Sequence, residues 1–311
     1  MKLKDLGEGG LIRRIRERFG AKADELPVGI GDDAAVIDLP AGHSLVFCSD
    51  LVAENSHFIR GLHPPASIGY KAIAANVSDV AAMGGVATHF LISMATPPEL
   101  DWTWIEDFFG GVESACRQFE ISLAGGDSSA SDRIFVDVAM IGRVPAGHAV
   151  RRSGAKAGDT VYVTGMLGSS ALGLERLKAG MTDDAAVKRH LHPEPRYKVG
   201  PAIAARAHAM IDVSDGFSTD LTHILQESKM SARIYKDRLP GWPGAEDHHV
   251  LHGGEEYELI VTGPPGLPRM IEGITLTPVG DIIESVGEHQ AFIIEGTRES
   301  VLKPKGWQHF E

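Results

Sequence analysis

The stretch SIGYKAIAANVSDVAAM, residues 67–83, consists mainly of small and apolar residues and carries one acidic side chain, Asp79. This composition predicts a helix that is buried on most of its surface. Apolar runs at 44–49 and 88–95 predict a strand on each side of this helix. A carboxylate in a buried helix is costly without a cation or a hydrogen-bond network beside it, so Asp79 is a candidate functional residue.

The elements that follow mix strands and helices without strict alternation. A helix is predicted at 102–119 and a strand at 134–144, and a polar segment rich in small residues, 145–158, indicates a domain junction. This mixture favours an α+β fold of two α/β sandwich domains, 1–148 and 149–311, over a doubly wound sheet. A chain of 311 residues also exceeds one comfortable hydrophobic core. The other predicted strands are at 160–164, 232–235, 257–262 and 290–295. The other predicted helices are at 9–20, 198–209 and 218–228, and one more follows the strand at 160–164 and ends near Ala179.

The composition excludes several classes of protein. The formal net charge of -12 argues against nucleic acid or an anionic membrane as the main partner. Two cysteines, Cys48 and Cys116, cannot form a disulfide framework. The sequence shows no signal-peptide pattern and no apolar run of membrane-spanning length. A cytoplasmic protein that binds neither nucleic acid nor membrane is therefore expected.

Aspartate recurs beside small, flexible residues in five segments of the chain. A single aspartate in a loop usually caps a helix or makes a turn, but five such segments suggest a shared site. Hard oxygen ligands without histidine or cysteine suit Mg²⁺, which commonly bridges carboxylates and phosphates. The segments are GIGDDAA (29–35), CSD (48–50), NVSDVAAMGG (76–85), GGDSS (125–129) and DVSDG (212–216).

The first of these segments also matches the glycine pattern of a dinucleotide-binding loop, at Gly29, Gly31 and Ala34. Such a loop offers bare backbone N–H groups to a pyrophosphate, whereas Asp32 and Asp33 would repel it. The chain also contains no GxxxxGK[ST] sequence. A Rossmann fold and a P-loop enzyme are therefore both disfavoured.

The aspartate segments occur in order with three longer motifs, RRSGAKAGD (151–159), DVSDGFSTDL (212–221) and HGGEEYEL (252–259). Together they resemble the thiamine-monophosphate kinase family, which belongs to the ATP-binding superfamily shared with aminoimidazole ribonucleotide synthetase. The resemblance runs from about Leu11 to Phe310. It implies ATP-dependent phosphorylation of thiamine monophosphate to thiamine diphosphate, assisted by Mg²⁺ and without a catalytic general base.

The resemblance also implies a homodimer whose N-terminal sheets pair around the twofold axis. The N-terminal domain would bind ATP and Mg²⁺, and the C-terminal domain would complete the nucleotide and substrate site. A tryptophan face suits the flat thiazolium cation of the substrate, and a glutamate can accept a hydrogen bond from its aminopyrimidine. Matched position by position, the implied Mg²⁺ ligands are Asp33, Ser49, Asp50, Asp79, Asp127, Asp212 and Asp215; the ATP contacts are Gly126, Arg152, Ser214 and Phe109; and the thiamine monophosphate contacts are His57, Glu255 and Trp307.

Four positions depart from the family's pattern. Cys48 stands where serine or threonine is usual beside the metals, and a thiol is a poor Mg²⁺ ligand. Asn55 replaces a common glycine, His252 replaces a common serine, and Phe109 replaces an ATP-contacting tyrosine. Two alternatives stay open: an enzyme like aminoimidazole ribonucleotide synthetase, and a nucleotide-binding homologue that has lost catalysis.

Overall fold

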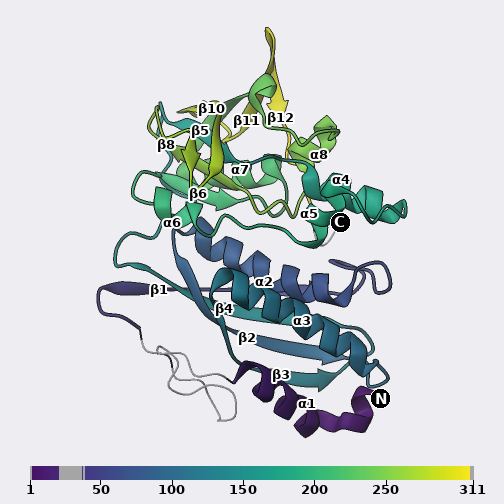
Figure 1. The fold of residues 1–311 in the computed structure, drawn as a ribbon. Coiled ribbons are helices and arrows are strands. Elements are labelled where there is room, and N and C mark those ends of the chain that lie inside the picture. The colour runs from purple at the N-terminus through teal and green to yellow at the C-terminus, as the bar shows by residue number, and fades with distance from the viewer. Residues whose placement is uncertain (1, 21–36, 38, 309–311) are drawn as a thin grey trace. The chain divides into compact units, whose positions relative to one another are not determined.

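The computed structural model describes residues 2–20, 37 and 39–308 (Figure 1). The chain divides into two compact units, which are described separately. Unit 1 comprises Met1–Val80 and Val86–Ala146, and unit 2 comprises Ala81–Gly85 and Gly147–Glu311. Unit 2 therefore includes a turn that the predicted boundary after residue 148 places in the first domain.

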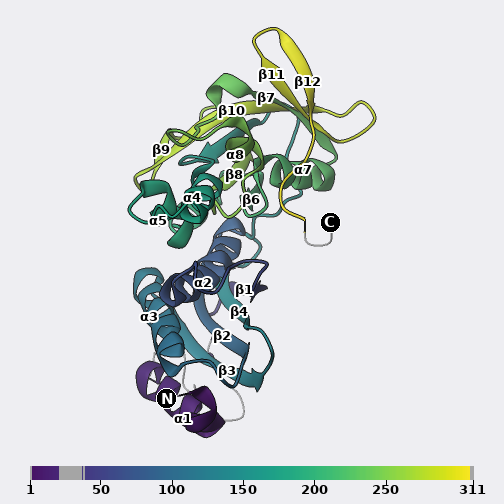
Figure 2. The same cartoon turned by 90° about the vertical axis from the view of Figure 1, so that its right-hand side faces the viewer.

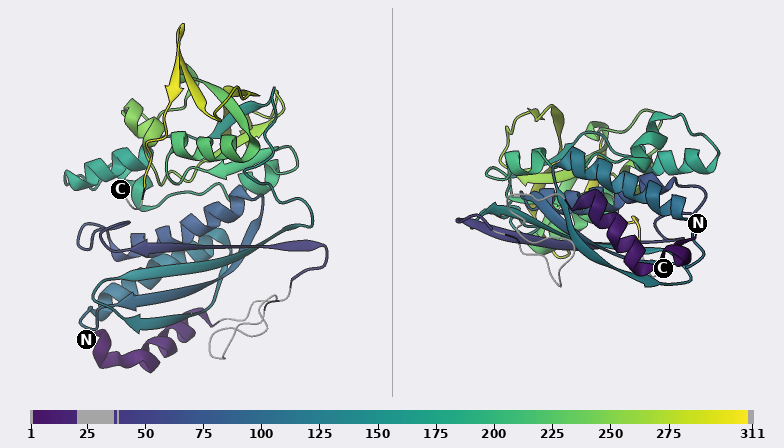
Figure 3. Two further views of the ribbon diagram at one scale, coloured as in Figure 1. Left: turned by 180° about the vertical axis from the view of Figure 1, so that it is seen from behind. Right: turned by 60° about the horizontal axis from the view of Figure 1, so that its bottom comes forward.

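Unit 1 is built on a four-stranded sheet in the order β1-β4-β2-β3. Strand β4 is antiparallel to both β1 and β2, and β2 is parallel to β3. Helices α2 and α3 cover one face of this sheet (Figure 1), and the view from behind shows its other face in front of them (Figure 3). The strands are β1 (His43–Ala53), β2 (Val86–Thr96), β3 (Ser122–Ala130) and β4 (Phe135–Pro145), and the helices are α1 (Leu3–Phe19), α2 (Pro65–Ala82) and α3 (Trp102–Phe119).

Alternation along β4 explains which face the helices cover. Val136, Val138 and Met140 are fully buried, whereas the residues between them are partly exposed. Because side chains alternate between the faces of a strand, the even-numbered residues of β4 point toward α2 and α3. The two helices approach each other closely at Gly111, where a Cβ atom would lie 1.8 Å from the carbonyl oxygen of Ala66.

Unit 2 contains an eight-stranded sheet, in which seven strands follow the order β12-β11-β7-β10-β5-β8-β6 and β9 pairs with β10. Strands β11 and β7 are parallel, and the other pairs are antiparallel. The strands are β5 (Thr160–Thr164), β6 (Ala209–Asp212), β7 (Met230–Tyr235), β8 (Leu259–Gly263), β9 (Met270–Ile271), β10 (Ile274–Glu284), β11 (Ala291–Glu295) and β12 (Arg298–Leu302). The helices are α4 (Ser169–Lys178), α5 (Ala185–Leu191), α6 (Val199–Ile203), α7 (Phe217–Ser228), α8 (Asp247–His252) and a short 3₁₀ helix, η1 (Lys236–Arg238).

Both faces of this second sheet are buried around β5. Val161 and Val163 of β5 belong to a core cluster with Phe217 of α7, whereas Tyr162 between them belongs to a second cluster with Ile203 of α6. Alternate residues of β5 therefore pack on opposite sides of the sheet. The predicted fold class, two domains that each combine helices with a sheet, is confirmed.

Five strands, β3, β6, β9, β10 and β12, run through segments for which the sequence predicts no strand. Strand β3 contains GGDSS, and β6 ends at the first aspartate of DVSDG. Gly, Asp and Ser are poor strand formers, so pairing with neighbouring strands decides their conformation. The helix predicted at 198–209 is also shorter, since α6 covers Val199–Ile203. None of the helices in the described part of the chain is long and apolar enough to cross a membrane.

Candidate active site

The loop between β6 and α7 gathers three of the predicted site residues. Strand β6 ends at the buried Asp212, and Ser214 and Asp215 follow before α7 begins. The loop turns at Gly216, whose φ of 122° is unfavourable for a residue with a side chain. A Cβ atom there would also lie 2.7 Å from the carbonyl oxygen of His252. Glycine at this position therefore lets the loop fold against a distant segment of the chain.

Asp220 of α7, which is not among the predicted site residues, holds this loop in place. Its side chain is 2% exposed, and Oδ2 accepts hydrogen bonds from the backbone amides of Asp215 at 3.1 Å and Gly216 at 3.0 Å. Burial raises the pKa of Asp220 well above its usual value, and the charges of Asp212 and Asp215 raise it further. Ligand atoms of Asp215, Asp220 and His223 lie within 4.8 Å of one another. The sequence signal for Asp220 is its place as the third aspartate of DVSDGFSTDL.

Two further segments bind the backbone of the same loop. The backbone N–H of Glu255 donates to the carbonyl oxygen of Ser214 at 2.7 Å, and that of Trp307 donates to the carbonyl oxygen of Asp215 at 3.0 Å. At Gly306 a Cβ atom would lie 2.1 Å from the Asp215 carbonyl oxygen, so the C-terminal segment packs closely on the loop beside α7 (Figure 2). The structure therefore brings predicted residues from three distant stretches of sequence together, with the Trp307 side chain exposed.

The HGGEEYEL segment holds two non-glycine residues in the left-handed conformation, Glu255 with a φ of 59° and Tyr257 with a φ of 53°. This conformation costs about 1 kcal/mol for a residue with a Cβ atom. The backbone N–H of Tyr257 donates to the carbonyl oxygen of Val213 at 2.9 Å, which fixes the segment beside the loop. The Glu255 carboxylate lies 3.6 Å from Nδ1 of His190 in α5. The surrounding contacts therefore determine where the Glu255 carboxylate lies.

In unit 1, β1 places two predicted metal ligands on opposite faces of the sheet. Cys48 and Asp50 share one face, and the Cys48 sulfur lies 3.6 Å from the backbone oxygen of Asn76 in α2. Helix α2 also carries Asp79, about one turn after Asn76. Ser49 points to the other face, where its hydroxyl donates to Oδ1 of Asp137 at 2.8 Å. The side chains of Ser49 and Asp50 therefore point to opposite faces of the sheet.

Asp127 lies on the same face as Ser49. Asp127 of β3 is paired with Ser93 of β2, and Ser93 is paired with Asp137 of β4, so their side chains form a row across the sheet. Ser93 and Asp137 lie outside the sequence motifs, although Asp137 interrupts the apolar run IFVDVAMI. This row and the Ser49 hydroxyl offer hard oxygen ligands. Asp33, the remaining predicted ligand of this unit, lies outside the described residues.

The residues predicted to contact ATP have different surroundings. A Cβ atom at Gly126 of β3 would lie 1.9 Å from the carbonyl oxygen of Ile92. The close approach of β3 to β2 therefore requires glycine at this position. Arg152 is exposed. Phe109 is buried in unit 1, and its ring centroid lies 5.8 Å from that of Phe19. A contact between Phe109 and ATP stays a prediction.

Comparison with known proteins assigns the family. Residues 31–144 match the family model for the N-terminal domain of AIR synthase related protein, and residues 156–268 match the family model for its C-terminal domain. Thiamine-monophosphate kinase of Aquifex aeolicus is 34% identical over 100% of both chains, and that of Escherichia coli is 35% identical over 98% of both. The chain belongs to the thiamine-monophosphate kinase family.

Solved structures of thiamine-monophosphate kinases share this fold. The enzyme from Stenotrophomonas maltophilia has a TM-score of 0.81 at 32% identity, covering 91% of this chain and 95% of that one. A structure of AaThiL complexed with AMPPCP and TMP has a TM-score of 0.79 at 34% identity, covering 100% and 99%. The hydrogenase maturation protein HypE in complex with ATP, at 19% identity and a TM-score of 0.79, shares the fold alone.

The structure explains two departures from the pattern of thiamine-monophosphate kinases. Asn55, which stands where glycine is common, has a φ of 71°, and asparagine tolerates this conformation better than most residues. The same turn holds the predicted substrate residue His57, whose Nδ1 accepts a hydrogen bond from the backbone N–H of Ala53 at 3.0 Å. His252 places Nδ1 2.8 Å from the Ser218 hydroxyl, and burial lowers its pKa.

Glu256 should make the stability of the chain depend on pH. Its buried carboxylate accepts hydrogen bonds from the Ser169 hydroxyl at 2.6 Å and the Ser170 backbone amide at 2.7 Å, and burial raises its pKa from 4.5 to about 7. The folded state therefore keeps a proton that the unfolded state loses. This contribution is fully present below pH 4.5 and is lost as the pH rises to about 7, which lowers the free energy of unfolding by about 3 kcal/mol.

The substitution Glu256→Gln is expected to flatten this slope, because a neutral side chain binds no proton in either state. Asp220 contributes a slope of the same sign, so the slope should decrease without vanishing. Urea unfolding at a series of pH values between 4.5 and 7.5 measures the effect. The control is the exposed Glu288→Gln, which should keep the wild-type slope. Identical slopes in wild type and Glu256→Gln would contradict the assignment.

Proposed function

We propose that this chain transfers the terminal phosphoryl group of ATP to the phosphate of thiamine monophosphate, giving thiamine diphosphate and ADP. The observation that carries the proposal is the meeting of three segments in unit 2, which brings Glu255 and Trp307 to Ser214 and Asp215. Similarity to thiamine-monophosphate kinases over the whole chain supports it. His57 and Glu255 are proposed to complete the contacts with thiamine monophosphate.

The acidic residues fit a role in holding Mg²⁺. Around the β6–α7 loop, the pKa of Asp220 is raised partly by the charges of Asp212 and Asp215, and such crowding of carboxylates favours a hard cation. When bound, Mg²⁺ supplies positive charge that neutralises the phosphate oxygens of both substrates. The proposed ligands are Asp33, Ser49, Asp50, Asp79 and Asp127 of the N-terminal domain and Asp212 and Asp215 of the C-terminal domain.

The residues of the chain mainly bind and align the two phosphates. The acceptor is a phosphate oxygen that is largely ionised at neutral pH, because the second pKa of a phosphate ester is about 6. A general base is therefore not required. The guanidinium of Arg152 suits phosphate oxygens, and Gly126 and Ser214 are proposed to lie against ATP. The rate enhancement would come from positioning and charge compensation.

Trp307 is proposed to stack on the thiazolium ring of thiamine monophosphate. The substitution Trp307→Ala is expected to raise KM for thiamine monophosphate about tenfold and to leave kcat within about twofold, because stacking holds the ring alike in ground and transition states. Steady-state kinetics at saturating ATP measures both constants. The matched control is Trp307→Phe, which keeps an aromatic face and should give an intermediate KM. Equal losses in kcat and kcat/KM would argue against a stacking role.

The open face of the unit 1 sheet is proposed to pair with a second copy of this chain. In the described residues, this face carries the exposed apolar side chains Leu45, Phe47 and Leu51 of β1 and Leu91 of β2, and Phe47 is 67% exposed. Exposed apolar side chains gathered on one face are typical of an interaction surface. The N-terminal domain would therefore form the dimer.

The substitution Phe47→Glu is expected to convert the dimer to a monomer, because it would place a charge in the apolar interface. Size-exclusion chromatography with light scattering measures the mass at a concentration where the wild type is dimeric. The control is Val286→Glu, since Val286 of unit 2 is 97% exposed and should not affect assembly. Dimers of unchanged stability in Phe47→Glu would place the interface elsewhere.

Incubation of the chain with ATP, Mg²⁺ and thiamine monophosphate, followed by chromatography of the products, tests the proposed reaction. Thiamine diphosphate and ADP should form in equal amounts. Free thiamine should be a poor substrate, because its hydroxyl requires a base and lacks a phosphate that binds metal. A rate of ATP hydrolysis that is unchanged by thiamine monophosphate but increased by formylglycinamidine ribonucleotide would instead indicate the aminoimidazole ribonucleotide synthetase reaction.

A further inference from the structure

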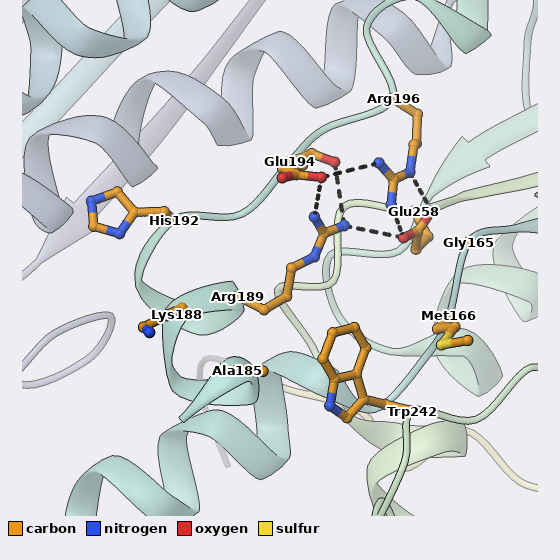
Figure 4. A pocket seen from close by; sticks show the side chains of 10 residues that line it. All are labelled: Gly165, Met166, Ala185, Lys188, Arg189, His192, Glu194, Arg196, Trp242 and Glu258. Carbon is orange, nitrogen blue, oxygen red and sulfur yellow. Dashed lines mark hydrogen bonds and ion pairs between the residues drawn. The ribbon is translucent and has the colours of Figure 1, made fainter. Parts of the chain in front are cut away.

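Unit 2 contains a pocket of about 470 Å³ that the proposed reaction does not use (Figure 4). Its volume lies in the range of small-molecule binding sites. None of the residues proposed to bind ATP, Mg²⁺ or thiamine monophosphate lines it. The pocket is formed by the loop after β5, by α5 and the segment that follows it, and by Trp242 and Glu258.

A buried ion pair forms one wall of the pocket. Glu258 is 1% exposed, and it accepts hydrogen bonds from Nε of Arg196 at 2.6 Å, from Nη2 of Arg189 at 3.1 Å and from the Thr164 hydroxyl at 2.6 Å. Arg196 is also buried, and its Nη2 makes a second bond to Glu258. Because Glu258 is held by a strand and by both guanidinium groups, this part of the wall is fixed.

One buried carboxylate cannot neutralise two guanidinium groups, and the second counter-charge comes from an exposed residue. Glu194 has a side chain that is 62% exposed, and its carboxylate lies 2.8 Å from Nη1 of Arg189 and 3.8 Å from Nη1 of Arg196. Glu256 is a weak counter-charge, because burial raises its pKa to about 7 and its oxygens are engaged by Ser169 and Ser170. Glu194 is therefore the anion that a ligand could replace.

The rest of the pocket suits a flat ring and a second positive contact. Trp242 and Met166 provide an aromatic and an apolar surface, and Figure 4 shows both away from Glu194. Lys188 of α5 lies at the exposed side, where its ammonium group pairs with Asp183 at 2.5 Å. Without Glu194, two arginines of the lining face one carboxylate, and Lys188, which Asp183 pairs at the exposed side, adds a further positive group; this balance of charges favours a phosphate.

We propose that this pocket binds a small phosphorylated molecule with a flat ring. Its phosphate would replace the Glu194 carboxylate on Arg189 and Arg196, and its ring would pack against Trp242. The site is distinct from the proposed transfer site, where carboxylates dominate and anions require a metal.

Titration calorimetry of the full chain with ADP in EDTA tests the proposal. ADP carries both a ring and phosphates, and without metal the aspartates of the transfer site repel it. The substitution Glu194→Gln is expected to tighten ADP binding about fivefold, because it removes the competing charge by a change at an exposed side chain. The substitution Lys188→Gln, also at an exposed position, is expected to weaken binding about threefold.

Three comparisons complete the experiment. The exposed Glu288→Gln makes the same charge change as Glu194→Gln outside the pocket and should leave ADP affinity unchanged. Inorganic phosphate should bind more weakly than ADP, and Trp242→Ala should remove this difference, because the ring contact would be lost. No ADP binding by either wild type or Glu194→Gln overturns the proposal, as does equal affinity in wild type, Glu194→Gln and Glu288→Gln. Phosphate binding as tight as ADP binding overturns the role of Trp242.

Discussion

Removal of divalent metal by EDTA is expected to reduce phosphorylation of thiamine monophosphate to background, and Mg²⁺ or Mn²⁺ is expected to restore it. ATP and thiamine monophosphate are both anionic, and the proposed site surrounds them with carboxylates such as Asp212 and Asp215. Without a cation these charges repel one another, so the phosphates cannot approach. Zn²⁺ should restore little activity, because it prefers nitrogen and sulfur ligands in tetrahedral geometry.

Thiamine diphosphate formation should be measured by chromatography after dialysis against EDTA and again after each metal is added back. The melting temperature before and after dialysis distinguishes loss of chemistry from loss of structure. Full turnover in metal-free buffer would exclude the proposed mechanism, whereas a folded and inactive chain that recovers with Mg²⁺ would support it.

The substitutions Asp212→Asn and Asp79→Asn are each expected to lower kcat at least about a hundredfold, or roughly 2.7 kcal/mol of activation free energy. Asp212 is buried at the end of β6 and stands beside Asp220, whose pKa its charge raises. Asparagine keeps the shape of the side chain and removes the charge that would hold Mg²⁺. Folding should be retained, because the loss of one carboxylate lowers the repulsion in the empty site.

The matched control is Asp237→Asn, an exposed aspartate of η1 that should keep wild-type activity. Rates should be measured over a wide range of Mg²⁺ concentrations, and thermal melting should be measured in parallel. Near-normal kcat at saturating Mg²⁺ in both variants would mean that Asp212 and Asp79 have structural roles.

Much of the fold could be predicted from the sequence, because the signals that determine it are local. The buried pattern at 67–83 corresponds to α2, and the helix predicted at 102–119 corresponds to α3. Strand β3 could not be predicted, because its Gly and Asp residues have low strand propensity and adopt this conformation through pairing with β2. Strand β6 is short and buried along its whole length, so it shows no alternation of apolar and polar residues. Whether a segment such as β3 forms a strand depends on the neighbouring strand with which it pairs.

The arrangement of the candidate site could be predicted less well from the sequence. Motifs identify Ser49 and Asp50 as neighbours in the chain, but the predicted strand ends at residue 49, and the continuation of β1 to Ala53 places their side chains on opposite faces. Asp137 accepts a hydrogen bond from the hydroxyl of Ser49 on the neighbouring strand. Asp220 accepts one from the backbone amide of Asp215. Asp137 is far from Ser49 in the sequence, and Asp220 lies within α7. The hydrophobic periodicity of the sequence therefore does not indicate either contact.

The left-handed conformation of Glu255 places two kinds of selection in conflict. A glycine or asparagine there would adopt the observed φ of 59° with less strain, so a search for thermostable variants should recover such substitutions. The same substitutions would remove the carboxylate proposed to recognise thiamine monophosphate. Variants selected for heat resistance alone are therefore expected to lose substrate affinity at this position, and a screen for both properties should retain glutamate.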